Sequence, residues 1–426
     1  MIAPYFVPRR RVGSLRPFKF AIHLRKYGYQ PVVLTLSNPG DFLTERESEL
    51  LQNVKIIEIE SPFDRTMSEK KVATDYSDNQ AGAFTDKLMN WVDKHTPLDT
   101  WIYLFRTRYS QIYKKAKKVN PDLIWTTGDP WSGFWLGKKL AADFSKPFVA
   151  DFRDPWTLAN VNIRKRSSFS SGIDREIEKK VIQSAQKITF TSKKTEHIYS
   201  DHYQLPSEKT ETIYNSYDCT IRENHANLPF INKLNPDHLN LMFFGRFRWL
   251  SPVNPIAEAL YLLKRKSPFV ASKIMVHSFG EPDQQNENFI KKMGLEKNFM
   301  FHEPVVPEKM LSVLKSADML LLSTDENREE IIPAKLWDYL SVEVPIFSIV
   351  PNEEVGDIIM KTKAGIQVHP DHKEEIAELL GSFVDAKKSD DSVFSMDADL
   401  PDRNVYEASH TTKKLASIFD ELMQNA

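Results

Sequence analysis

The chain has 426 residues, of which 41% are hydrophobic and 27% charged, with a net charge of −1. This composition excludes a disordered or collagen-like chain, and the length favours two domains over a single core. The single Cys219 excludes an intramolecular disulfide framework and a cysteine-based zinc cluster, and it favours a reducing, cytoplasmic location. No apolar run approaches the length of about 18 residues that a membrane span needs.

Short apolar strings alternate with amphipathic stretches, which predicts parallel strands joined by crossover helices. In the first half, strands are predicted for IAPYF near the start and for 31–36, 122–127, 148–152, 187–192 and 211–215, with helical spacing at 18–28 and 135–144. The stretch 63–118 has weaker strand signals and many aromatic and cationic residues. We expect it to be a helical insertion.

The pattern restarts after a polar, Asn-rich segment. Strands are predicted at 239–245, 272–280, 298–304, 318–323, 344–350 and 364–370, and helices at about 254–266, 307–316, 333–341, 353–361, 371–386 and 404–424. The predicted fold is α/β, with two doubly wound, Rossmann-like domains. They comprise 1–215, a linker 216–238, a second domain 239–403 and a C-terminal helix 404–426 that can cross back to the first domain.

The two predicted halves differ strongly in charge. Residues 1–215 contain 34 Lys and Arg against 25 Asp and Glu, a net +9, whereas residues 216–426 contain 23 against 33, a net −10. A basic half is expected when one surface meets an anionic ligand or membrane, and a chance imbalance is the alternative.

Candidate site residues of the first half follow predicted strands. Gly13 and Ser14 lie between the first strand and its helix, where backbone N–H groups can approach a phosphate, although the dinucleotide pattern GxGxxG is absent. Asp129 in TTGDPW and Arg153 in DFRDPW stand beside tryptophans at two successive strand ends. Such groups suit a polyhydroxyl ligand, and helix capping by Asp129 with a buried Asp–Arg pair is the structural alternative.

Candidate residues of the second half are mainly cationic and acidic. Gly245, Arg246 and Arg248 follow a strand directly, where guanidinium groups can clamp a diphosphate. Glu330, Pro333, Lys335 and Asp338 surround a predicted helix start, and an isolated Lys–Asp surface pair is the alternative there. The loops around Gly280 and Val305 follow two further predicted strands, and we expect them to contribute to ligand selectivity.

Other patterns favour neither a metal nor a nucleic acid. The 11 histidines have no HExxH spacing, and DAD at 397–399 lies in a polar tract. Aromatic residues between 91 and 113 interleave with Arg106, Arg108 and the lysines of KKAKK at 114–118, which indicates an interfacial or acceptor-binding surface. No nucleic-acid-binding module accompanies them.

Together these residues resemble the bacterial glycosyltransferases of family 4, whose GT-B fold has two Rossmann-like domains facing a cleft. The resemblance covers nearly the whole chain and rests on IAPYFVP, VGSLRPFKFAIHLRKYGYQPVVLT, DFRDPW, IYNSYD, GRFR and IIPAKLWDYLSVEVPI. Within this family, DFRDPW and PxKLxxYL resemble the sequence patterns of the enzymes that build cell-surface polysaccharides. The resemblance implies a retaining transfer of sugar from a UDP- or GDP-sugar to an acceptor hydroxyl, without a required cofactor.

The resemblance also implies roles for individual residues. Glu330 would bind the donor sugar, Asp338 the ribose hydroxyls and Arg246 the diphosphate, while Gly13 and Ser14 would form the first phosphate-side loop. A lipid-linked glycan acceptor would approach the first domain, at the inner face of the membrane, with Asp129 as a positioning group or weak base. Asp338 replaces the usual Glu, and Ser251 stands where relatives have a lysine.

Two other readings remain open at the level of sequence. A sugar-nucleotide epimerase shares the two-domain fold and would turn over its substrate without an acceptor. A non-catalytic scaffold would bind a membrane or a partner protein through the basic half.

Overall fold

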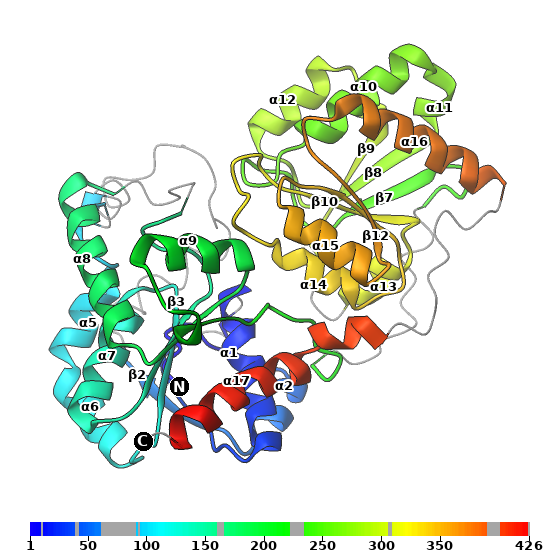
Figure 1. The fold of residues 1–426 in the computed structure, drawn as a ribbon. Coiled ribbons are helices and arrows are strands. Elements are labelled where there is room, and N and C mark those ends of the chain that lie inside the picture. The colour runs from blue at the N-terminus through cyan, green and yellow to red at the C-terminus, as the bar shows by residue number, and fades with distance from the viewer. Residues whose placement is uncertain are drawn as a thin grey trace. The chain divides into compact units, whose positions relative to one another are not determined.

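The computed structural model describes residues 1–9, 12–38, 42–60, 91–92, 94–159, 166–221, 234–305, 309–389 and 401–424. The chain forms two compact units, Met1–Ile221 with Glu407–Ala426, and Arg222–Tyr406 (Figure 1). Each is an α/β unit with parallel strands, which confirms the predicted fold class. Among the helices that the structure describes, none is both long and apolar enough to cross a membrane.

The first unit has helices on both sides of its strands (Figure 1). Its helices are α1 (Val12–His23), η1 (Leu24–Tyr27), α2 (Glu45–Leu51), α5 (Trp101–Thr107), α6 (Tyr109–Lys117), α7 (Ser132–Phe144), α8 (Ser168–Ser184), α9 (Lys193–Tyr203), η2 (Ser207–Lys209) and α17 (Ala408–Gln424). Its strands are β1 (Val32–Leu36), β2 (Lys55–Ile59), β3 (Ile124–Gly128), β4 (Phe148–Phe152), β5 (Lys187–Phe190) and β6 (Thr210–Thr212).

A single residue near the start joins the strands of this unit into one doubly wound arrangement. The pairs run β2–β1 and β3–β4–β5–β6, and Ile2 bridges Leu34 of β1 and Thr126 of β3. The Ile2 N–H donates to the Trp125 carbonyl at 2.8 Å, and the Thr127 N–H donates to the Ile2 carbonyl at 3.3 Å. The segment IAPYF, predicted as a strand, therefore lies between β1 and β3, but it forms bridges at one residue and not a full strand.

The second unit is built on one six-stranded parallel sheet. Its strands are β7 (Leu239–Phe243), β8 (Ile274–Phe279), β9 (Phe299–His302), β10 (Met319–Ser323), β11 (Ile346–Ile349) and β12 (Gly365–Val368). Its helices are α10 (Asn254–Lys266), α11 (Pro268–Ser272), α12 (Gln284–Lys292), η4 (Glu296–Asn298), α13 (Met310–Lys315), α14 (Ala334–Leu340), α15 (Glu353–Lys361), α16 (Lys373–Lys388) and η6 (Pro401–Tyr406). The strand order β12-β11-β10-β7-β8-β9 is that of a doubly wound nucleotide-binding sheet.

Strands with continuous apolar runs were predicted well, whereas elements with more polar patterns were missed. The sequence interpretation did not include β2, α2, α8, α9 or α12. Several of these helices begin with a side-chain cap: Ser192 accepts the Thr195 N–H at α9, and Asp283 accepts the Asn286 N–H at α12. The predicted insertion contains α5 and α6, but 61–90 lies outside the described residues, as do 222–233 of the predicted linker and the DAD at 397–399.

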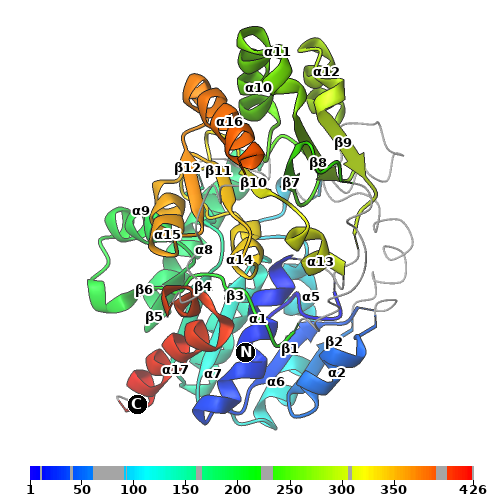
Figure 2. The same cartoon turned by 90° about the vertical axis from the view of Figure 1, so that its right-hand side faces the viewer.

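The C-terminal helix belongs to the first unit, as the predicted crossing back requires. Helix α17 packs against α1 and η1, and Figures 1 and 2 both draw it alongside α1. Leu415, Ile418 and Phe419 of α17 lie in an apolar cluster with Phe20 and Leu24. Residues more than 380 positions apart are also joined by a hydrogen bond, because the Tyr27 hydroxyl donates to the Ser409 carbonyl at 2.9 Å.

Candidate functional site

The carboxyl ends of β7 and β10 form the switch point of the second unit. These two strands are neighbours, and the strand order proceeds from them in opposite directions. In sheets of this kind, ligands bind beyond the carboxyl ends of the strands at the switch point. Gly245, Arg246 and Arg248 lie on the loop after β7. Glu330 and Pro333 lie on the connection from β10 to α14, and Lys335 and Asp338 lie in α14 itself.

Hydrogen bonds to neighbouring elements hold the start of the loop after β7. The Gly245 carbonyl accepts the Phe279 N–H at 3.0 Å and the Ser278 hydroxyl at 2.8 Å. The Phe244 N–H donates to the Tyr339 hydroxyl at 2.9 Å, and that hydroxyl donates to the Leu321 carbonyl at 3.1 Å. Tyr339 of α14 thus ties together the ends of β7 and β10.

Lys335 extends from α14 across the start of this loop. Its Nζ lies 4.5 Å from the centroid of the Phe243 ring, and a Cβ at Gly245 would lie 3.1 Å from its Cε. Gly245 also has a φ of +127°, a conformation that side chains rarely adopt, so both the backbone and the lysine favour glycine there. Lys335 is therefore partly buried beside the strand end and is not an isolated surface residue.

The charge on Lys335 is destabilised by its surroundings. Burial and the nearby Arg248 guanidinium lower the pKa of Lys335 from 10.5 to about 8, against the opposing effect of Asp338. A desolvated ammonium beside a guanidinium favours an anion, which would relieve both effects.

The other predicted residues of this unit lie on the same group of loops. Arg246 lies beside Gly280, whose N–H donates to the His302 carbonyl at 2.7 Å. Glu330 is 1% exposed and Pro333 precedes the first residue of α14. Their connection is fastened to the loop after β7, because the Ser323 hydroxyl donates to the Pro252 carbonyl at 3.0 Å and the Asp325 N–H to the Leu250 carbonyl at 3.3 Å.

In the first unit, Arg153 brings three predicted segments together. Its Nη1 donates to the Gly13 carbonyl at 3.0 Å, its Nη2 to the Asp129 carbonyl at 3.5 Å, and its Nε to the Asp154 carboxylate at 3.1 Å. A Cβ at Gly13 would lie 2.1 Å from Arg153 Nη1. The close approach explains why glycine stands at this position, at the start of α1.

Neighbouring polar residues of the first unit are buried. Ser14 is fully buried, and its hydroxyl has no hydrogen-bond partner among the described residues. Asp151, also fully buried, pairs with Arg16 at 2.7 Å and accepts the hydroxyls of Thr127 and Thr189. The partner of the buried aspartate is therefore Arg16 of α1, which lies 135 positions away.

The TTGDPW segment is held by a polar contact at the start of α7 and by stacked aromatic rings. Asp99 accepts the Ser132 N–H at 2.9 Å. The rings of Trp131 and Trp156 stack at 5.1 Å with an interplanar angle of 7°, and Trp131 also stacks on Phe134. The two indoles pack against the core of the unit.

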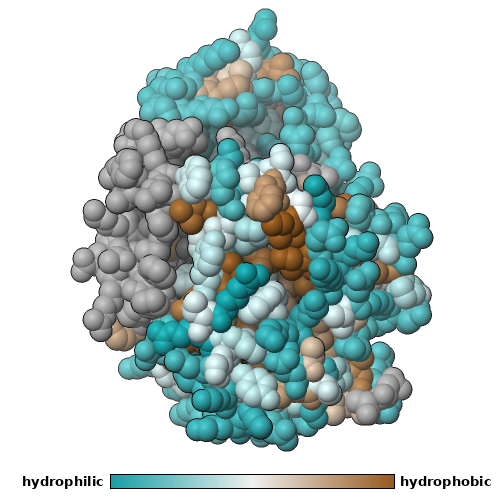
Figure 3. All heavy atoms as spheres, turned by 90° about the vertical axis from the view of Figure 1, so that its left-hand side faces the viewer, coloured by the Kyte–Doolittle hydropathy of each residue, from teal (hydrophilic) through white to brown (hydrophobic). Residues whose placement is uncertain are grey.

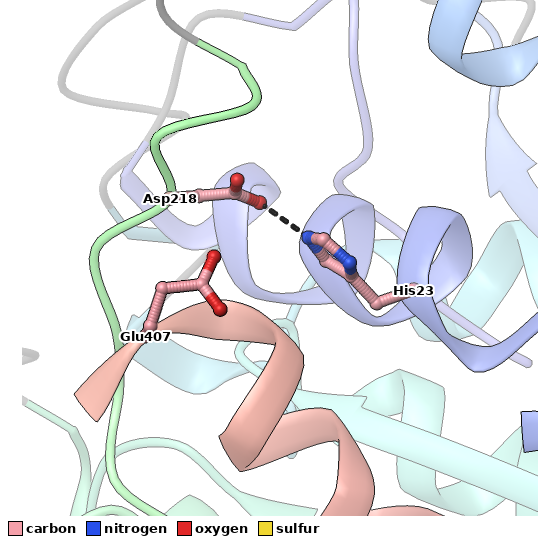
Figure 4. Close-up of side chains that lie close together, drawn as sticks. All are labelled: His23, Asp218 and Glu407. Carbon is pink, nitrogen blue, oxygen red and sulfur yellow. Dashed lines mark hydrogen bonds and ion pairs between the residues drawn. The ribbon is translucent and has the colours of Figure 1, made fainter. Parts of the chain in front are cut away.

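One group of side chains in the described residues has spacing suitable for a metal ion. Potential ligand atoms of His23, Asp218 and Glu407 lie within 4.8 Å of one another (Figure 4). His23 Nε2 is 2.9 Å from Asp218 Oδ2, the other Asp218 oxygen accepts the Thr220 N–H, and Glu407 accepts the Ser409 N–H at the start of α17. Because these contacts satisfy the carboxylates, we assign the group to fastening α1, the segment after β6 and α17.

Sequence reasoning missed several residues that shape the candidate site. Tyr339 was part of the quoted PxKLxxYL pattern, so its position was visible although its two hydrogen bonds were not. Asp99 and Arg16 act through partners that are distant in sequence. No periodicity or spacing signal identifies such pairs.

Two doubly wound units, one with cationic residues at its switch point, define a two-domain α/β protein. The family model described as Glycosyltransferase Family 4 matches residues 18–221, and the model described as Glycosyl transferases group 1 matches residues 224–393. The chain is therefore a glycosyltransferase of the GT-B, family 4 type, which confirms the resemblance. Among curated protein sequences, none matches this chain significantly.

Solved structures with the same fold span nearly the whole chain. A glycosyltransferase from Rickettsia africae is 14% identical with a TM-score of 0.62, and the match covers 100% of this chain and 98% of that chain. Anabaena HepE in complex with UDP is 12% identical with a TM-score of 0.62, covering 96% and 95%. Sucrose-phosphate synthase from Thermosynechococcus elongatus is 13% identical with a TM-score of 0.60, covering 96% and 92%. At these identities the similarity defines the fold.

Proposed function

We propose that this glycosyltransferase binds a UDP- or GDP-sugar at the switch point of its second unit and transfers the sugar with retention of anomeric configuration. The observation that carries the proposal is the partly buried Lys335. It lies beside Arg248, and the pKa of its ammonium group is lowered to about 8. Arg246 lies on the same loop. The similar fold of HepE, which was solved in complexes with UDP and UDP-glucose, supports a nucleotide sugar as the donor.

The chemistry of the proposed step follows from where charge develops. The bond between the sugar C1 and the β-phosphate oxygen breaks, the acceptor oxygen forms the new bond to C1 on the same face, and the departing phosphate takes the acceptor proton. Negative charge grows on the diphosphate during this step, so Arg246 and Lys335 stabilise the transition state more than the ground state. Glu330 holds the donor sugar and Asp338 the ribose hydroxyls.

The acceptor side of the proposal uses the first unit. Gly13, Ser14, Asp129 and Arg153 belong to three segments that meet at the Arg153 guanidinium. Asp129 positions the acceptor hydroxyl or weakly assists its deprotonation. The acceptor class that we propose is a lipid-linked glycan in cell-surface polysaccharide assembly, reached at the inner face of the membrane.

A basic face of the first unit supports approach to an anionic membrane. Helix α6 exposes lysines, and further lysines lie on α7, which contacts α6, and on α8, which contacts α7. Figure 3 shows that hydrophilic residues cover much of this side around a central apolar patch. Burial and the nearby Lys180 ammonium lower the pKa of Lys138, so positive charges face one another there. Arg106 lies over the Trp135 ring at 5.7 Å, which places a cation beside an aromatic group suited to an interface.

Donor binding and hydrolysis with a panel of UDP-, GDP- and ADP-sugars test the proposed activity. Wild-type protein is expected to bind one class and to release the nucleoside diphosphate slowly without an acceptor. Arg246→Ala and Lys335→Ala are expected to weaken both properties, whereas Lys361→Ala on the exposed end of α15 serves as the control. Absence of binding to every nucleotide sugar, or full activity in both variants, contradicts the proposal, and inversion at the product anomeric carbon contradicts retention.

Sedimentation with lipid vesicles tests the membrane proposal separately. Binding is expected to phosphatidylglycerol-containing vesicles but not to pure phosphatidylcholine. Replacing Lys114, Lys115 and Lys117 with Gln is expected to weaken binding roughly 100-fold, from about 1 kcal/mol per basic residue. The matched triple replacement of Arg265, Lys266 and Lys292 on the second unit is expected to have little effect. Equal effects of the two triples contradict this assignment of the face.

A further inference from the structure

Glu178 is a buried carboxylate that contacts the loop containing Arg153, and the proposed reaction assigns it no role. Glu178 of α8 is fully buried, and the four hydrogen bonds that the structure gives it come from neutral donors. Burial raises the pKa of Glu178, against the opposing effect of these hydrogen bonds. A desolvated carboxylate carries a cost, so its complete set of donors points to a specific structural task.

The donors come from the loop after β4 and from α9. Glu178 Oε1 accepts the Thr157 N–H at 3.2 Å and the Tyr199 hydroxyl at 2.6 Å. Oε2 accepts the Thr157 hydroxyl and, at 3.0 Å, the Tyr203 hydroxyl. Tyr199 in turn accepts the Trp156 N–H at 2.7 Å. Two successive backbone N–H groups of the loop therefore end on this one carboxylate, directly or through Tyr199.

Trp156 and Thr157, whose N–H groups these hydrogen bonds hold, follow Arg153 by three and four positions. We call this set of hydrogen bonds from Glu178 and Tyr199 to the loop the brace. The Thr191 hydroxyl holds the Arg153 carbonyl at 2.6 Å, so the loop is fixed at both ends while the guanidinium reaches the carbonyls of Gly13 and Asp129. A small shift of the loop would move the guanidinium away from both carbonyls.

We propose that Glu178, acting through Tyr199, is a positioning residue that sets the place of Arg153 in the acceptor-side site. This proposal rests on the proposed function for its catalytic consequence, but the brace itself has a readout that needs no activity. The hydrogen bonds of Glu178 lead to Thr157, Tyr199 and Tyr203, so it acts on the loop backbone.

The two tyrosines provide a matched pair of variants. Tyr199→Phe and Tyr203→Phe each remove one hydroxyl that donates to Glu178, but only Tyr199 also holds a loop N–H. Tyr199→Phe is expected to lower turnover about tenfold or more, since small misplacements at an active site can cost up to about 100-fold. Tyr203→Phe is expected to stay within about twofold of wild type. Nucleotide binding, which uses the second unit, is expected to be equal in both.

Variants at position 178 separate hydrogen bonding from charge. Gln can keep its oxygen toward the Thr157 N–H and Tyr199, while its amide donates to the hydroxyls of Thr157 and Tyr203, which are able to accept. Glu178→Gln is therefore expected to remain active and Glu178→Leu to lose activity. In an Arg153→Gln background, Tyr199→Phe is expected to cause no further loss of turnover, because the brace acts through that side chain.

Amide hydrogen exchange of the full chain provides the activity-independent measurement. Tyr199→Phe is expected to accelerate exchange in residues 154–158, and Tyr203→Phe is not. Equal exchange in the two variants overturns the brace even if the enzyme is active. Faster exchange with unchanged turnover overturns the positioning role. If wild-type protein turns over no nucleotide sugar, the proposed function fails, and the exchange comparison still decides whether Glu178 and Tyr199 hold the loop.

Discussion

The two units share a doubly wound topology but use their cations differently. In the first unit, Arg16 is held by the buried Asp151 and Arg153 by backbone carbonyls of the adjoining loops. In the second unit, Lys335 lies beside Arg248, and its ammonium pKa is lowered. Cations thus organise the loops of one unit, whereas in the other the Lys335 ammonium is desolvated beside a second cation. This contrast is our reason for proposing that the more acidic half binds the diphosphate.

The largest effect is expected where a cation is structural. Arg16→Met leaves Asp151 buried without its charged partner, and breaking such a pair costs about 3–5 kcal/mol. Urea unfolding should show this loss of stability, whereas Arg25→Met on the exposed side of η1 should change it by less than about 0.5 kcal/mol. Equal stability of the two variants would contradict the structural role that we assign to Arg16 in the first unit.

A second variant tests the acidic part of the donor site. Glu330→Gln keeps the size of a buried side chain but would weaken the hydrogen bonds that we propose to the transferred sugar, so turnover is expected to fall about 100-fold. UDP affinity should be unchanged, because UDP lacks the transferred sugar. Glu329→Gln, at the exposed neighbouring position, is the control. Steady-state kinetics and UDP titration distinguish this outcome from general damage, which would reduce both quantities.

A third variant tests the loop junction of the first unit. A methyl group at Gly13 would lie 2.1 Å from Arg153 Nη1, so Gly13→Ala must displace the guanidinium. Turnover is expected to fall about tenfold, within the range for a displaced active-site group. Gly172→Ala is the control, because no atom lies within 4 Å of its added Cβ. Kinetic measurements in which both variants resemble wild type would show that Arg153 position is irrelevant to the reaction.

Sequence patterns predicted the parts of this molecule that depend on local order. The run MLLLS at β10 is buried at every position and apolar at all but the last, because central parallel strands are buried on both faces. The edge strand β2, KIIEI, mixes charged and apolar residues and was missed. The site residues of each unit were assigned to strand ends by the same logic, but their contacts were not. Arg16 with Asp151 and His23 with Asp218 join positions 135 and 195 apart, so only the folded chain brings them together.

The smallest expected effect is the pH dependence of donor binding. Since the Lys335 pKa is lowered to about 8, most of its positive charge is lost between pH 7 and pH 9. UDP affinity is expected to fall by up to about tenfold over this range, with the midpoint set by that pKa. Isothermal titration at several pH values measures it, and Lys335→Met should bind more weakly at pH 7 but lack this step. An identical pH profile in the variant would assign the titration to another group.

The stability of the free protein is expected to change in the opposite direction. The folded pKa of about 8 lies below the ordinary value of 10.5, so the unfolded chain binds the Lys335 proton more tightly. Stability contributed by this group therefore rises as pH increases from about 8 toward 10.5. A saturating nucleoside diphosphate should reduce this gain, because it stabilises the ammonium in the folded state. As pH rises, deprotonation of Lys335 thus weakens donor binding and stabilises the free protein. A cation paired with a carboxylate would instead destabilise the free protein on losing its proton, because such a pair raises the pKa.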